Sequence, residues 1–168
     1  MNAFPARIGP ATRAGSSVRN LRRLRITLCA NAGFSTITGL VLLADPNGVA
    51  GLIGASHPGW VRLVGTALLP FAAGVAGVAV ARAGTLLGLT PVIAAADLIW
   101  VLGSAGTIAA AWFSPRGNAV VVSVAVVVGA FAWRQLVHWL RARRLDSGNA
   151  HPTTAGSIVA PWAIERRQ

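Results

Sequence analysis

The sequence predicts an all-α protein built as a four-helix transmembrane bundle. Hydrophobic residues make up 54% of the 168 residues and charged residues 11%, whereas an average soluble domain has roughly 25% charged residues. The 115 residues between Arg25 and Arg141 include only six charged side chains, too few to keep the surface of a soluble domain in water. In lipid only helices or closed barrels satisfy their backbone groups, and the alternating pattern of a barrel is missing. The spans are therefore expected to be helices.

The first two spans are predicted at about residues 24–44 and 61–82. Each contains a charge-free window of nineteen residues, 26–44 and 63–81. That length is about what a helix needs to cross the hydrocarbon core of a bilayer.

The third and fourth spans are predicted at about residues 87–112 and 118–140. The third lies in a 33-residue stretch, 83–115, whose only charge is Asp97. The fourth is rich in valine and continues past Arg134. Valine runs favour strands in soluble proteins, but length outweighs that preference in lipid.

The remaining segments are expected to lie outside the bilayer. Residues 1–20 are read as a flexible, arginine-rich cytoplasmic segment before the bundle at 21–144, and residues 145–168 as a flexible cytoplasmic tail. Between the first two spans, Asp45-Pro46-Asn47-Gly48 is a turn signature. The apolar residues that follow are too few to cross the membrane and are expected to lie on its surface.

The distribution of arginine predicts the orientation. Placing both termini inside puts twelve of the fifteen arginines in the cytoplasm, Arg62 and Arg116 outside, and Arg134 within a span. This obeys the positive-inside rule. All fifteen basic residues are arginine and none is lysine, which indicates a GC-rich bacterial genome, so we expect a multi-pass protein of the bacterial inner (plasma) membrane. The inner arginines are expected to meet anionic lipid headgroups. The net charge of +11 does not indicate nucleic acid as a partner, since no aromatic-rich basic domain exists outside the spans.

Small and polar residues predict how the helices pack. Ala73, Gly77 and Ala81 recur every four residues, a ridge suited to close helix approach. In the first span, four polar residues spaced four, four and three apart share one face that should point inward: Thr27, Asn31, Ser35 and Thr38. These residues either form hydrogen bonds between helices or line the wall of a polar cavity.

Asp97 is the centre of the candidate site. An ionised carboxylate at its depth costs about 2.5 to 3.5 kcal/mol on insertion scales, so it should face inward and be paired, or be protonated. Arg134 is the only basic side chain within a span, and Asn31, Ser35 and Trp100 lie at similar depths. Three arrangements remain open: an Asp97–Arg134 pair that sets helix register, a protonatable or cation-binding carboxylate, or a neutral Asp97 with Arg134 extended to the headgroups.

Catalytic, metal and cofactor chemistry is not expected. The single cysteine, Cys29, allows no intramolecular disulfide and no CxxC pair. The three histidines, at 57, 138 and 151, are too dispersed for haem or di-iron ligation, and a phosphate loop would need a lysine that the chain lacks. The sequence therefore favours a non-enzymatic protein.

Two segments resemble small four-span bacterial membrane proteins of uncharacterised function. They are Asn31-Ala32-Gly33-Phe34-Ser35 followed by Gly39-Leu40, and the segment from Ala96 to Gly103. The resemblance covers about residues 20 to 140 and implies a compact four-helix bundle. The expected role is that of a structural or accessory membrane component, with a second copy or another membrane protein as candidate partner. The alternative is a small oligomeric transporter or proton-coupled carrier that uses Asp97.

Overall fold

The structure is a computed structural model in which five helices are joined by short connections. It describes the backbone of residues 10–147 and the side chains of residues 18–144. The helices are α1 (Pro10–Ala44), α2 (Pro46–Ile53), α3 (Pro58–Val80), α4 (Ala83–Ala109) and α5 (Pro115–Ser147). Four of them are long and apolar enough to cross a membrane. The predicted all-α class with four candidate spans is therefore confirmed.

The helix ends differ from the predicted boundaries. Helix α1 begins at Pro10, so residues 10–20 are helical rather than part of a flexible segment, while residues 1–9 and the tail from 148 onward lie outside the described residues. Helix α4 ends at Ala109, before Ala111 with its positive φ of 54°. The boundaries were placed by charge, which marks the edge of the hydrocarbon core, whereas arginine, alanine and leucine continue a helix readily beyond it.

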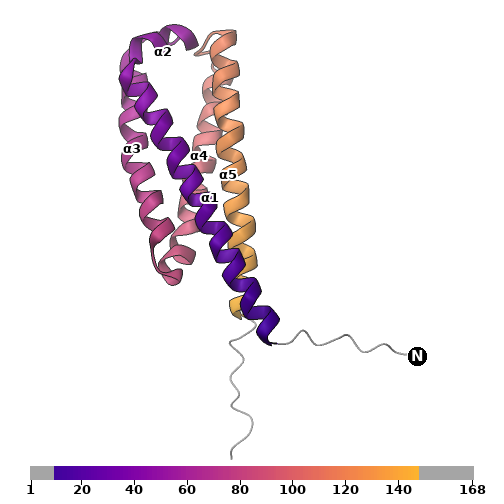
Figure 1. Cartoon of the computed structure of the whole chain (residues 1–168). Helices are drawn as coiled ribbons and strands as arrows, with labels where there is room; N and C mark the ends of the chain where they lie inside the picture. The colour runs from indigo at the N-terminus through magenta and orange to yellow at the C-terminus, as the bar shows by residue number, and fades with distance from the viewer. Residues whose placement is uncertain (1–9, 148–168) are drawn as a thin grey trace, which may run out of the picture.

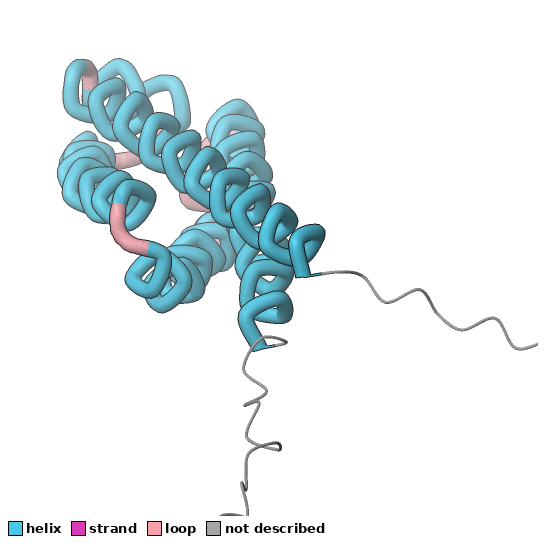
Figure 2. Tube along the Cα trace, turned by 60° about the horizontal axis from the view of Figure 1, so that its bottom comes forward, coloured by secondary structure: helices cyan, strands magenta, loops and turns pink. Residues whose placement is uncertain are grey.

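The four long helices pack in an open arrangement rather than a closed square. Helix α1 lies against α3 and α5, and α5 also lies against α4 (Figures 1 and 2). Helices α3 and α4 are joined by the turn at Ala81 and Arg82, and they diverge from it with little mutual contact (Figure 1). The core joins α1, α3 and α4 through the buried residues Leu24, Leu28, Ala32, Val75, Ala79, Leu86 and Ile93.

The outer surface is apolar, as a lipid-facing surface must be. Large hydrophobic side chains from all four long helices are more than half exposed, among them Ile37, Leu63, Leu102 and Val126. In water such a surface would favour association, but in a bilayer the lipid tails cover it. The buried residues include many small and polar side chains beside the leucines and valines of the core, because tight packing and hydrogen bonds drive helix association in lipid.

Helices α1 and α3 approach each other closely at Gly39 and Gly65. A Cβ atom on Gly65 would lie 3.0 Å from the carbonyl oxygen of Gly39, and one on Gly39 would lie 3.2 Å from that of Gly65. The ridge predicted from Ala73, Gly77 and Ala81 does not make this contact. Ala73 and Gly77 are exposed, and a Cβ on Gly77 would meet open space. The spacing of small residues marks a candidate ridge but does not say which one faces a neighbour.

The segment after Asp45, which the sequence analysis placed on the membrane surface, forms the short helix α2. This helix is hydrogen-bonded to the start of α5. The Asp45 carboxylate caps α2 by accepting from the backbone N–H of Gly48 at 2.8 Å. Helix α2 ends at Gly54, whose φ of 72° suits glycine. The next contact is with the start of α5, where the N–H of Ser114 donates to the carbonyl of Ile53 at 3.0 Å.

At the opposite end, Arg25 of α1 caps the end of α3. Its guanidinium donates to the carbonyl of Ala79 and, at 2.6 Å, to that of Ala81. A cation is favourable at the C-terminus of a helix, where carbonyls lack intrahelical partners. Arg25, read from the sequence as the edge of the first span, is therefore also a contact between two helices.

A second carbonyl without a helical donor is satisfied by Trp139. Pro91 lies inside α4 and has no N–H to donate to the carbonyl four residues earlier, that of Leu87. The indole Nε1 of Trp139, on α5, donates to this carbonyl at 2.7 Å. This hydrogen bond joins α5 to α4 beside Pro91.

Candidate functional site

Asp97 lies on the inward face of α4. The buried residues of this helix recur every three or four positions from Leu86 through Thr90, Ile93 and Asp97, the period of one helix face. The side chain of Asp97 is 2% exposed. Its inward orientation agrees with the sequence prediction, which left its partner open.

Two amide side chains bind the Asp97 carboxylate, one from each neighbouring helix. The Nδ2 of Asn31 on α1 donates to Oδ2 at 2.8 Å, and the Nε2 of Gln135 on α5 donates to the same oxygen at 2.9 Å. Both amides are fully buried. The carboxylate therefore links three helices, and we call Asp97, Asn31 and Gln135 the polar triad.

The predicted Asp97–Arg134 pair is not formed. Arg134 is exposed, and within residues 18–144 the carboxylate makes its hydrogen bonds with the two amides only. Successive residues of a helix are rotated by about 100°, so the inward position on α5 falls to Gln135 and its neighbour Arg134 points outward. Placing Arg134 in the site was wrong because depth alone was considered.

Gln135 is the member of the site that sequence reasoning missed. From Val128 onward, the buried positions of α5 are Val128, Ala132, Gln135, His138 and Ala142, spaced four, three, three and four apart, the period of one helix face. Apolar residues lie on every side of this span, so their spacing does not mark the packed face, and the signal in the sequence was the amide of Gln135 itself. Burying an amide in a membrane helix costs free energy unless the amide is hydrogen-bonded, as it does for the polar residues Asn31 and Ser35 of α1.

The polar stripe of α1 points inward as predicted, but only one member bonds to another helix. Thr27, Asn31 and Ser35 are buried and Thr38 is half-buried. The hydroxyl of Thr27 donates to the carbonyl of Arg23 in its own helix. Ser35 lies 3.5 Å from the Oδ1 of Asn31, long for a hydrogen bond. The stripe therefore supplies one interhelical donor, Asn31.

Trp100 lies near the triad without bonding to it. Its indole nitrogen is buried and finds no hydrogen-bond partner within the described part of the chain, and the same is true of Oε1 of Gln135. Trp100, placed in the candidate site by its depth, therefore makes no hydrogen bond with Asp97. Trp100 lines the cavity described next, whereas Gln135 does not.

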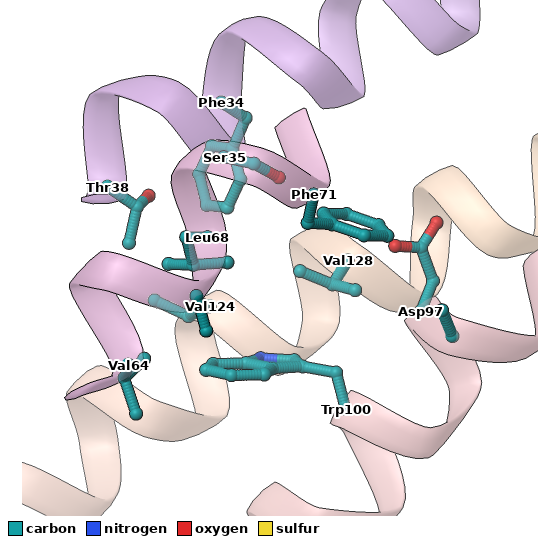
Figure 3. A pocket seen from close by; sticks show the side chains of 12 residues that line it. Phe34, Ser35, Thr38, Val64, Leu68, Phe71, Asp97, Trp100, Val124 and Val128 are labelled. Atoms are coloured by element: carbon teal, nitrogen blue, oxygen red, sulfur yellow. The ribbon is translucent and has the colours of Figure 1, made fainter. Parts of the chain in front are cut away.

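A cavity of about 190 Å³ lies next to the triad. All four long helices contribute to its wall, and Asp97 lies at its edge (Figure 3). The wall is mainly apolar and includes the aromatic rings of Phe34, Phe71 and Trp100. Figure 3 shows one carboxylate oxygen directed toward Phe71, with the indole of Trp100 below. Ser35 and Thr38 also line it.

No family of known proteins, no curated protein and no solved structure matches this chain. What the site can do follows from its own chemistry. In the part of the chain that the structure describes, His, Cys, Asp and Glu side chains form no group of three suited to a metal ion. The site offers one carboxylate that accepts hydrogen bonds from two amides and that also lines a cavity with aromatic walls.

Proposed function

We propose that this protein is a non-enzymatic integral membrane protein, a structural or accessory component in which the polar triad sets the packing of three spans. The observation that carries this proposal is the convergence of Asn31 and Gln135 on one oxygen of Asp97. Each bond joins a different pair of helices, so rotation of α1, α4 or α5 would break at least one. Such bonds contribute about 0.6 kcal/mol each in membrane proteins, up to about 1.7.

The test is a pair of substitutions at Asp97. Asp97→Leu removes the acceptor and leaves two buried amide donors unpaired, so unfolding should become easier by about 1 to 3 kcal/mol. Asp97→Asn keeps one oxygen that accepts from both donors, and its cost should stay below about 1 kcal/mol. Reversible unfolding in mixed detergent micelles measures both. Equal stability of the wild type and Asp97→Leu would exclude a packing role for the triad.

A second candidate function is a small oligomeric transporter or proton-coupled carrier. The observation that favours it is the cavity beside Asp97, because buried carboxylates in spans often mark ion or proton pathways. In this case Asp97→Asn would stay folded and abolish pH-dependent uptake into proteoliposomes. Retention of uptake by that variant would exclude Asp97 as the coupling residue.

We further propose that the protein lies in a bacterial plasma membrane with both termini in the cytoplasm. The exposed side chains Arg19, Arg22 and Arg23 of α1 lie at the same end as the last turns of α5 (Figure 1), which bear Arg141 and Arg144. This end would meet anionic headgroups.

Single-cysteine labelling tests the orientation. In a Cys29→Ala background, a membrane-impermeant maleimide should label Ser56→Cys in intact cells, since Ser56 is exposed between α2 and α3. Ala83→Cys, exposed at the start of α4, should be labelled only after permeabilisation. The opposite pattern would show the reverse orientation.

A further inference from the structure

The two oxygens of the Asp97 carboxylate have different surroundings. Oδ2 accepts both amide hydrogen bonds, whereas Oδ1 accepts none within residues 18–144. Asp97 also lines the cavity. The amides therefore hold the carboxylate from one side and leave Oδ1 for a donor that enters the cavity.

The described basic side chains do not neutralise this carboxylate. Arg134 is exposed on the outer surface, and Arg25 binds the end of α3. An ionised carboxylate among apolar helices is costly without a counter-ion. A cationic molecule in the cavity would supply the missing charge and donate to Oδ1.

The remaining walls suit an apolar body and a cation. Phe34, Phe71 and Trp100 line the space beside Asp97, and aromatic rings attract ammonium groups through their π faces. Apolar side chains such as Leu68 and Val128 complete the wall (Figure 3). A dry cavity of about 150 Å³ holds benzene in another protein, so about 190 Å³ suits a molecule only slightly larger.

We propose that this cavity is a binding site for a small apolar molecule that carries one protonated amine. The ammonium group pairs with Asp97 and the apolar body lies among Phe34, Phe71 and Trp100. Helices α3 and α4 both line the cavity and have little contact with each other. Binding of the amine does not require the protein to be a transporter. It is also compatible with the packing role of the triad, because the two amides bind Oδ2 and the amine would bind Oδ1.

Binding of three matched probes to the whole protein tests the proposal. We would titrate ring-fluorinated 2-phenylethylamine, 2-phenylethanol and propylbenzene into phosphatidylcholine nanodiscs and follow saturable shifts by fluorine NMR. The amine is charged at neutral pH, the alcohol is a neutral donor, and propylbenzene is apolar with a similar size. We expect the amine to bind at least tenfold more tightly than either neutral probe. Equal affinities, or no saturable binding of the amine, would overturn the proposal.

Three variants locate the bound amine. Asp97→Asn removes the charge and keeps the acceptor for both amides, so it should weaken amine binding at least tenfold. Ala67→Phe should also weaken it, because Ala67 lines the cavity and is not a member of the triad. Ala76→Phe is the matched control on the same helix, at an exposed position outside the cavity wall, and should bind as the wild type does.

The variants test two statements separately: that the Asp97 carboxylate binds the amine, and that the amine lies in this cavity. Unchanged binding by Asp97→Asn would overturn the role of the carboxylate. Weakening by Asp97→Asn with unchanged binding by Ala67→Phe would place the amine outside this cavity and overturn the assignment of the site. Thermal melts of each variant in the same nanodiscs confirm that loss of binding is not loss of fold.

Discussion

Replacing Gly65 by leucine is expected to force α1 and α3 apart. A Cβ at this position would already lie 3.0 Å from the Gly39 carbonyl oxygen and 3.0 Å from Leu42 Cβ, so the rest of a leucine side chain has no room. The contact between α1 and α3 is the most extensive in the structure. Overpacking of a tight contact costs about 1 to 3 kcal/mol, occasionally more, and we expect at least about 2 kcal/mol here.

The measurement is the free energy of unfolding in mixed micelles. Gly74→Leu is the matched control, since Gly74 is on the same helix, is exposed and has open space around its Cβ position. It should not destabilise the protein, and removal of a glycine from the middle of a helix should stabilise it by about 0.5 to 1 kcal/mol. Equal losses in the two variants would mean that α3 does not approach α1 at Gly65.

Gly117→Ala is expected to separate α2 from the start of α5. Its methyl group would lie 2.1 Å from the carbonyl oxygen of Ile53, and a backbone atom cannot move aside as a flexible side chain can. The shift would break the hydrogen bond from the Ser114 N–H to the same carbonyl. We expect a loss of about 1 to 3 kcal/mol and faster amide hydrogen exchange throughout α2.

Gly51→Ala is the control for this substitution within α2. Gly51 is exposed and its Cβ position is open, so alanine should stabilise the helix by about 0.5 to 1 kcal/mol. Slower exchange in α2 for Gly51→Ala and faster exchange for Gly117→Ala would together support the contact. Identical exchange in Gly117→Ala and the wild type would contradict it.

Several features of the site could be read from the sequence and others could not. The depth of Asp97 and the inward direction of Asn31 follow from span limits and helical spacing. The choice between Arg134 and Gln135 depends on the rotation of α5, which the depth of a residue along the helix does not show. The hydrogen bond from Trp139 to the Leu87 carbonyl depends on the contact of α4 with α5 near Pro91, and no pattern within one helix predicts such a contact.

The sequence alone determined the class of the protein: all-helical, with four stretches long and apolar enough to span a membrane. Hydrophobic length and the scarcity of charge suffice for this, because lipid leaves the backbone few other solutions. Only the tertiary structure decided the partner of Asp97, the crossing at Gly39 and Gly65, and the capping of α3 by Arg25. Each of these depends on the rotation and register of one helix against another. In lipid, hydrophobicity does not distinguish a packed face from an exposed one, so close packing and polar contacts decide them.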